Sequence, residues 1–236
     1  PAPQRATQDP DVRQPPTGPS PARSFYVPTG WVSSGGAVDL LVLTPDNSVS
    51  GLKAALTPFP DLSVTVFPRE SLPSLSVDDL LSHDVVMTTN DKTWRLHGDG
   101  VEPERVGDVL ADYVDAGGKV ILNNFAYDWG RWKIEGRFKE QEYGPFTPAN
   151  DDFTGLSSLG TVHEPVHPVM AGVTEVTNRY LWQNQGLRPG ATRLADWHDG
   201  HIFAAANDNV VALNILPTDA GGAPGWTGDL PTLYHN

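Results

Sequence analysis

Amide, acidic and aromatic side chains follow the hydrophobic segments that we interpret as buried strands. They are Asp46, Asn47, Asn90, Asp91, Asn124, Tyr127 and Asp128. In a parallel α/β sheet, the loops after the strands meet at the carboxyl edge, where ligands bind. Amide and carboxylate groups there could bind sugar hydroxyls or a cation, and an aromatic ring could stack on a sugar. The alternative is that the Asn and Asp residues only form turns and cap helices.

Two pairs of histidines have spacings that resemble metal sites. His163 and His167 flank Glu-Pro-Val, but the prolines in this segment forbid the helix that would bring both rings onto one face. Residues 198–201, His-Asp-Gly-His, carry a hairpin-turn signal. Their two rings would lie about 5 Å apart between Cβ atoms and could bind a metal with Asp196 or Asp199. A solvated hairpin tip explains this pattern more simply, so we predict no metal and no other cofactor, and keep His167 as a candidate ligand-binding residue.

Aromatic and basic residues crowd into residues 125–146, directly after a segment that reads as a buried strand. This loop could stack on a glycan or contact another protein, because Trp and Tyr anchor both kinds of interface. The equally weighted alternative is that the loop folds over the sheet and buries its own rings. Its basic side chains would suit an acidic surface on another copy of the protein. The residues assigned to this interaction surface are Phe125, Trp129, Arg131, Trp132, Phe138 and Tyr143.

Composition narrows the classes of function that are open to the chain. Of its 236 residues, 39% are hydrophobic, which supports a folded core, and its net charge of −13 argues against nucleic acid or an anionic membrane as partner. No apolar run approaches the roughly 20 residues that a membrane-spanning helix needs. The absence of cysteine excludes disulfides, thiolate metal ligands and a cysteine nucleophile.

Strand and helix patterns alternate through the first half of the chain. The predicted strands are 37–44, 62–67, 84–89 and 119–122, and the predicted helices are 50–56, 76–83 and 103–116. The last helix has one apolar stripe, Pro103 at its first position and Gly117 at its end. Short connections and right-handed crossovers make this alternation a doubly wound sheet. Shorter β-like segments follow residue 146, so we predict an α/β fold with a mostly parallel sheet and added β-hairpins in the C-terminal third.

The chain divides into two regions of different composition. Residues 1–36 are rich in proline and lack hydrophobic periodicity at their start, which predicts an extended arm or linker that lies against its own domain or a neighbouring subunit. Residues 37–236 are predicted to form a single α/β domain. Because the chain begins with Pro1 rather than Met, we expect a processed piece of a larger secreted or surface protein.

Four segments together carry a resemblance to a known family. They are 40–44 (LLVLT), 111–122 (ADYVDAGGKVIL), 167–173 (HPVMAGV) and 210–214 (VVALN). In these segments the chain resembles the class I glutamine amidotransferase-like superfamily, on its trehalose-utilisation (ThuA-like) side. The resemblance covers most of residues 37–236 and implies a flavodoxin-like sheet with helices on both faces.

The sequence departs from that superfamily at the catalytic position. An amidotransferase would carry a Cys at the sharp turn after a central strand, backed by a His and a Glu. Here the strand ends in Asn123, Asn124 and Phe125, and without any Cys the thiolate chemistry of a glutaminase is excluded. We therefore predict a non-catalytic amidotransferase-like domain at an extracellular or cell-surface location. It would act as a structural or interaction module and would contact other copies or other domains through the arm and residues 125–146.

The alternative prediction keeps a ligand site at the carboxyl edge of the sheet. It is a ThuA-like carbohydrate-active enzyme, or a glycan-binding module, that uses the polar loop residues after the strands together with His167. The two predictions differ in whether these side chains line an open pocket or whether an aromatic ring such as Phe125 or Trp129 fills it.

Overall fold

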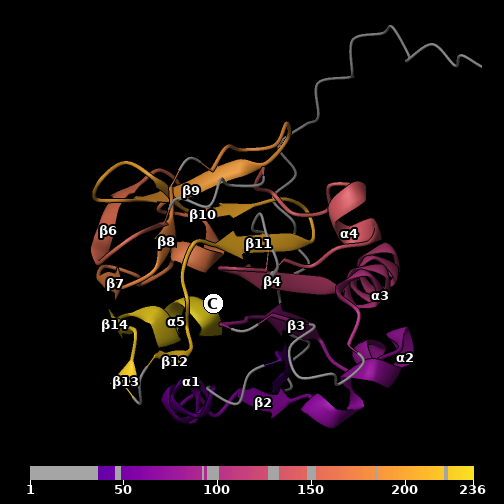
Figure 1. Ribbon diagram of the computed structural model, residues 1–236. Helices are drawn as coiled ribbons and strands as arrows, with labels where there is room; N and C mark the ends of the chain where they lie inside the picture. Colours follow the sequence, from indigo (N-terminus) through magenta and orange to yellow (C-terminus); the bar gives the residue numbers. More distant parts are fainter. Residues whose placement is uncertain are drawn as a thin grey trace, which may run out of the picture. The chain divides into compact units, whose positions relative to one another are not determined.

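The computed structural model describes residues 37–45, 49–91, 93–94, 101–126, 133–147, 153–183, 185–220 and 223–236. The predicted arm, residues 1–36, and the residues between these ranges lie outside this description. Within the described ranges the chain forms one large sheet with helices on both of its faces (Figure 1).

Parallel strands form one half of a ten-stranded sheet. Their order, β2-β1-β3-β4-β11, is the order of a flavodoxin-like sheet. Leu41 pairs with Val86, and Val86 pairs with Val120. The predicted doubly wound α/β core is therefore confirmed. The strands are β1 (Val38–Leu43), β2 (Leu62–Val66), β3 (Val85–Thr88), β4 (Lys119–Asn123) and β11 (Val210–Leu213).

Antiparallel strands continue the sheet from β11 in the order β10-β9-β6-β7-β14. The sheet as a whole is therefore mixed rather than mostly parallel. The pairs β9–β10 and β10–β11 are antiparallel because their connections are short, since parallel pairing needs a crossover of a dozen or more residues. The strands are β6 (Ser157–Val162), β7 (Val176–Asn178), β9 (Thr192–Trp197), β10 (Ile202–Ala206) and β14 (Trp226–Gly228).

Two small two-stranded sheets lie outside the large one. In the first, β5 (Phe153–Thr154) pairs with β8 (Leu181–Trp182), and in the second, β12 (Asp219–Ala220) pairs with β13 (Ala223–Pro224).

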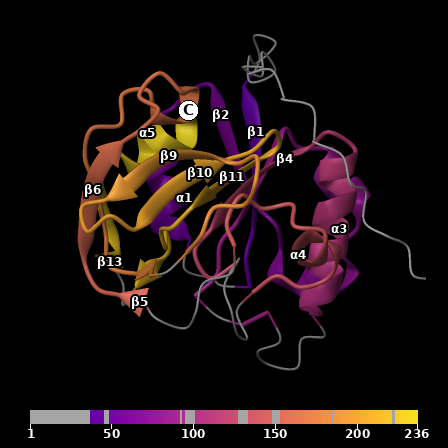
Figure 2. The same ribbon diagram turned by 90° about the horizontal axis from the view of Figure 1, so that it is seen from above.

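Helices cover the two faces of the parallel strands. Figure 2 shows α3 and α4 on one face and α1 and α5 on the other. Side chains of β1 alternate accordingly, because Leu41 and Leu43 belong to the core cluster that contains the α3 residues. The helices are α1 (Ser50–Leu56), α2 (Val77–Leu81), α3 (Pro103–Asp115), α4 (Arg137–Glu140) and α5 (Leu230–His235), with 3-10 turns η1 (Arg69–Ser74) and η2 (Pro168–Met170).

Helix α3 shows how local sequence fixes this architecture. It begins at Pro103 and buries Val106 and Leu110 in the core, as its apolar stripe predicts. Gly117 follows with a φ of +95°, the left-handed conformation that ends many helices. The loop that contains Glu135 passes so close to α3 that a Cβ at position 107 would be 1.7 Å from the carbonyl oxygen of Glu135. Only glycine leaves room for the loop there. Among the described residues, no helix is long and apolar enough to cross a membrane.

Candidate functional site

The carboxyl edge of the parallel strands carries polar side chains that are buried. They are uncharged, so this set supplies no acid, base or ion to the edge. Buried amides and hydroxyls of this kind are stable when the protein itself satisfies their hydrogen bonds. The set comprises Thr44, Thr88, Thr89, Asn90, Asn123, Asn124 and Asn214.

Asn123 and Asn124, at the end of β4, bond to the protein itself. Asn123 Nδ2 donates to the carbonyl of Thr88 at 3.0 Å, and Asn123 Oδ1 accepts from the Tyr234 hydroxyl at 2.5 Å. Asn124 Nδ2 donates to the carbonyl of Tyr180 at 3.0 Å. Neither side chain is exposed. These amides therefore join β4 to β3, to α5 and to the segment before β8.

Asn214 and Asn178 serve the same purpose at the end of β11. Asn214 Oδ1 accepts from the amide of Trp182 at 2.7 Å, and Asn214 Nδ2 donates to the carbonyls of Trp182 and Ile202 at 2.9 and 3.0 Å. Asn178 Nδ2 donates to the carbonyl of Leu216 at 3.1 Å. Each buried side-chain amide bonds backbone groups that have no neighbouring strand to pair with, because the regular hydrogen bonding of the sheet has ended there. Sequence reasoning did not single out either residue.

Phe125 occupies the sharp turn that follows β4. Its φ is +68°, a left-handed conformation that costs a residue other than glycine roughly 1–3 kcal/mol. Its half-buried ring packs edge-on against Trp182, with centroids 5.3 Å apart and planes at 87°. Enzymes of the superfamily that the sequence resembles would hold their nucleophile at this turn. Phe125 holds an aromatic ring there, which has no nucleophilic atom.

The predicted ligand-binding residues divide between described and undescribed parts of the chain. Asn90 is fully buried and Asp91 is exposed where the chain leaves β3. Because Leu43 pairs with Thr88, these two residues leave the sheet beside the end of β1. The described ends of β1 and β3 are therefore neighbours, and Thr89 N–H donates to the carbonyl of Leu43 at 3.3 Å. The remaining residues predicted for this edge, Asp46, Asn47, Tyr127 and Asp128, lie outside the described residues.

His167 forms a local cap at the start of η2. Its Nδ1 accepts from the amide of Val169 at 3.3 Å at the start of η2. Burial lowers the pKa of His167 below its usual value, and the nearby Glu164 opposes that shift. The η2 turn lies against α5, where Asn236 Nδ2 donates to the carbonyl of Ala171 at 2.6 Å. His167 thus uses its Nδ1 atom as a local cap of η2.

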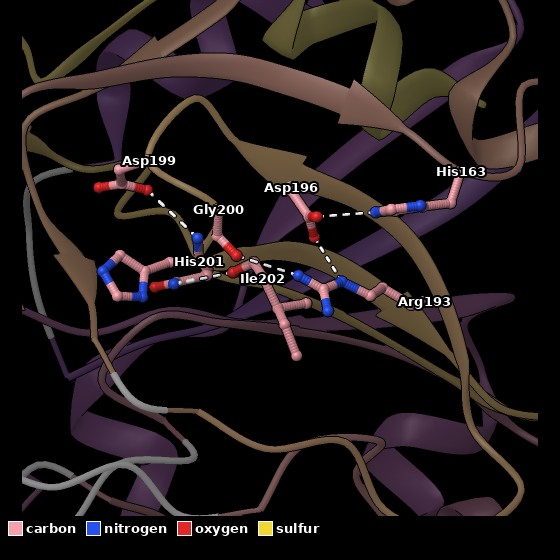
Figure 3. Close-up of polar contacts among 8 residues, drawn as sticks. His163, Arg193, Asp196, Asp199, Gly200, His201 and Ile202 are labelled. Carbon is pink, nitrogen blue, oxygen red and sulfur yellow. Dashed lines mark hydrogen bonds and ion pairs between the residues drawn. The ribbon is translucent and has the colours of Figure 1, made fainter.

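His163, Arg193 and Asp196 form a polar cluster that the sequence did not predict as a unit (Figure 3). His163 Nε2 lies 2.7 Å from Asp196 Oδ2, and Arg193 Nε donates to Asp196 Oδ1 at 2.5 Å. Arg193 Nη2 also donates to the carbonyl of Gly200 at 3.0 Å. The carboxylate of Asp196 is only 9% exposed and has a partner for each oxygen. It ties the loop after β6 to the β9–β10 hairpin.

The histidine pair at the hairpin does not converge on Asp196. Figure 3 shows the ring of His201 pointing away from that carboxylate, while His163 approaches it from another loop. Asp199 Oδ1 accepts from the amide of His201 at 3.3 Å, a bond that shapes the turn. In the part of the chain that the structure describes, no group of three or more His, Asp or Glu side chains could hold a metal ion.

Several described residues of the 125–146 loop pack into the protein, whereas residues 139–142 are exposed. Phe138 is only 4% exposed and lies in the core, so it cannot contribute to a contact surface. Tyr143 stacks on Phe138 with centroids 5.5 Å apart and donates from its hydroxyl to Asp115 at 2.7 Å. Arg137, one of the basic residues, pairs with Asp112 at 2.9 Å and with Asp115 at 3.0 Å. The other predicted surface residues, Trp129, Arg131 and Trp132, lie outside the described residues.

Comparison with known proteins supports the fold. No protein-family model and no curated protein matches this sequence. Among solved structures, a ThuA-like protein from Bacteroides uniformis is similar at a TM-score of 0.55 and 10% identity, over 84% of this chain and 86% of that one. A glutamine amidotransferase from Thermotoga maritima gives a TM-score of 0.49 at 8% identity, over 75% of this chain and 74% of its own. At these identities the likeness extends to the fold alone: the chain has the fold of a ThuA-like protein, with a flavodoxin-like core.

Proposed function

We propose that this chain is a non-catalytic amidotransferase-like domain that serves as a structural or interaction module. The observation that carries the proposal is the turn after β4, where Phe125 takes a left-handed conformation and packs on Trp182. Strained backbone conformations often occur at active sites, where the strain helps to position a reactive atom. Here the same turn presents a hydrocarbon ring.

The asparagines around that turn support the same reading. A residue that binds a ligand needs donors and acceptors that are free to face it, but Asn124 and Asn214 use their side-chain amides on backbone groups of the protein. Displacing those bonds would leave buried carbonyl and amide groups unpaired, at roughly 1–3 kcal/mol each. These two asparagines thus hold loops in place. An extracellular or cell-surface location remains part of the proposal.

Hydrolysis of a panel of nitrophenyl glycosides tests the proposal against the carbohydrate-enzyme alternative. The wild-type chain and the F125A variant are incubated with each glycoside, and release of nitrophenolate is followed by absorbance. We expect release at the rate of the protein-free buffer for both proteins. Turnover by the wild type that is lost in an Asn124→Ala variant of unchanged fold, checked by circular dichroism, would overturn the proposal.

A further inference from the structure

The strand β2, Leu62–Val66, forms one end of the large sheet (Figure 1). Its five residues, Leu-Ser-Val-Thr-Val, include no charge, no proline and no glycine. Natural edge strands usually carry one of these features, or are very short, because an open edge can pair with another chain. The opposite edge strand, β14, has only three residues and ends at Gly228, whose φ is +83°. Within β2 itself these features are absent, and Pro60 and Pro68 lie just outside the strand.

The backbone of β2 directs alternate residues outward. Val38 N–H donates to the carbonyl of Asp61 at 2.7 Å, and Phe67 N–H donates to the carbonyl of Val42 at 2.9 Å. Since successive residues of a strand alternate in direction, residues 61, 63, 65 and 67 bond to β1. Leu62, Val64 and Val66 therefore turn their carbonyls toward the open edge, and Val64 and Val66 also turn their N–H groups there. Among the described residues, no strand pairs with that side of β2.

The sequence around β2 is symmetric in character about Val64. Moving outward from Val64, the residues on either side are Ser63 and Thr65, then Leu62 and Val66, then Asp61 and Phe67, and finally Pro60 and Pro68. Within the strand a hydroxyl thus matches a hydroxyl and an apolar residue matches an apolar residue. Asp61 and Phe67 break this symmetry, and a proline lies beyond each of them. Two copies of such a strand fit each other around a two-fold axis, because that axis places residue 64 + n opposite residue 64 − n.

From these features we propose that two copies of this chain pair through β2, antiparallel and two-fold, with the axis at Val64. The inference deepens the proposed function by naming a partner and a surface for the interaction module. Val64 of each copy would form the hydrogen-bonded pair on the axis, as its outward backbone groups require. Ser63 would lie opposite Thr65 of the second copy, and Leu62 opposite Val66. The prolines at 60 and 68, which lack an N–H, limit the pairing to this short stretch.

Charge does not oppose pairing at this edge, although the chain carries a net charge of −13. Lys53 and Arg69 line a hollow of about 350 Å³ beside Val66, together with Glu70. Asp61, at the other end of β2, pairs with His235 at 2.9 Å. Among these described residues, the two cations and two carboxylates balance each other.

Sedimentation velocity of the full chain across a wide range of concentrations tests the pairing. We expect a reversible dimer for the wild type. The S63D/T65D variant places like charges face to face in both flanking pairs, so it should be monomeric. The S63K/T65D variant places opposite charges face to face, so it should dimerise at least as well as the wild type. The S158D/T161D variant alters two equally exposed hydroxyl residues on β6 and should dimerise like the wild type.

Cysteine cross-linking tests the register, since the chain has no cysteine of its own. Across the proposed axis the Cα atoms of residue 64 would be about 5.5 Å apart, within disulfide range. The Cα atoms of residue 65 would be about 7–8 Å apart. We expect V64C to form a disulfide-linked dimer in air and T65C to stay monomeric in denaturing gels. A wild type that is monomeric at every concentration would overturn this inference, as would dimers unaffected by S63D/T65D or equal cross-linking of both cysteine variants. None of these results depends on the glycoside assay, which alone judges catalysis.

Discussion

Removing the side-chain amide of Asn214 should destabilise the protein strongly. The side chain is fully buried and makes hydrogen bonds to Trp182 N, Trp182 O and Ile202 O at 2.7, 2.9 and 3.0 Å. Each net hydrogen bond contributes about 1 kcal/mol, and an unpaired buried partner adds to the loss. We therefore expect Asn214→Ala to lower the free energy of unfolding by about 3–5 kcal/mol. Urea unfolding followed by tryptophan fluorescence measures this difference.

A matched control and an isosteric variant sharpen the prediction. Asn209 is half-buried and its Oδ1 accepts one bond, from Lys119 Nζ at 2.6 Å, so Asn209→Ala should cost no more than about 1 kcal/mol. Asn214→Asp puts one oxygen, in the place of Nδ2, against the carbonyls of Trp182 and Ile202. Burial raises the pKa of the introduced carboxyl above about 3.9. The loss for this variant should therefore grow as the pH rises through that value. A loss for Asn214→Ala no larger than for Asn209→Ala would refute the view that the buried amides hold this edge together.

Three further predictions concern other parts of the fold. Replacing Gly107 by Ala should destabilise the protein by at least about 1–3 kcal/mol, because the new Cβ would meet a carbonyl oxygen at 1.7 Å. This loss should appear although Ala favours helices. In the same urea assay Gly155→Ala should be close to neutral, because a Cβ there would have nothing within 4 Å. Hydrogen bonds from backbone amides and a threonine hydroxyl hold the pKa of Asp229 below 3.8, so its contribution to stability is complete above that pH and is lost as the pH falls through the lower folded value. Asp229→Asn should therefore flatten the acid limb of a plot of melting temperature against pH, and an unchanged limb would contradict this. Burial raises the pKa of Tyr113 to about 12, so absorbance titration should show a late-ionising tyrosine, with stability falling between pH values of about 10 and about 12. The hydrogen bond to Asp115 also raises the pKa of Tyr143, so Tyr113→Phe should reduce the late step by one tyrosine.

The first four parallel strands, β1 to β4, were predictable because their signals are local, whereas the parallel pairing of β11 with β4 was not predicted. Continuous apolar runs before residue 122 predict buried strands, and the apolar stripe of α3 predicts a helix. Neither prediction depends on residues far away in the sequence. Proline and glycine at the two ends of α3 add start and stop signals that the structure confirms. The order of the antiparallel strands was not predictable in this way. The strand order depends on pairing between strands that are far apart in the sequence. For example, β6 pairs with β9 across more than 30 residues.

The polar residues at the carboxyl edge show where sequence reasoning ends. Asn124 has the same chemistry whether it bonds a sugar or the carbonyl of Tyr180, which lies 56 residues away in sequence. Its role therefore follows from the fold and not from its type or spacing. The same holds for His163 and Asp196, which lie 33 residues apart and meet only because β6 pairs with β9. Nothing local predicts the left-handed turn at Phe125, since aromatic residues seldom adopt it.

Hydrogen exchange of the side-chain amide protons of Asn124 and Asn214, measured by NMR with and without added sugars, tests the central claim most directly. If these amides are structural, their protons exchange only when the protein unfolds, and their resonances stay in place as glucose or trehalose is added. Rapid exchange in the folded protein, or a saturable shift of the Asn124 and Phe125 resonances with sugar, would show an open ligand site at this edge and would contradict the account.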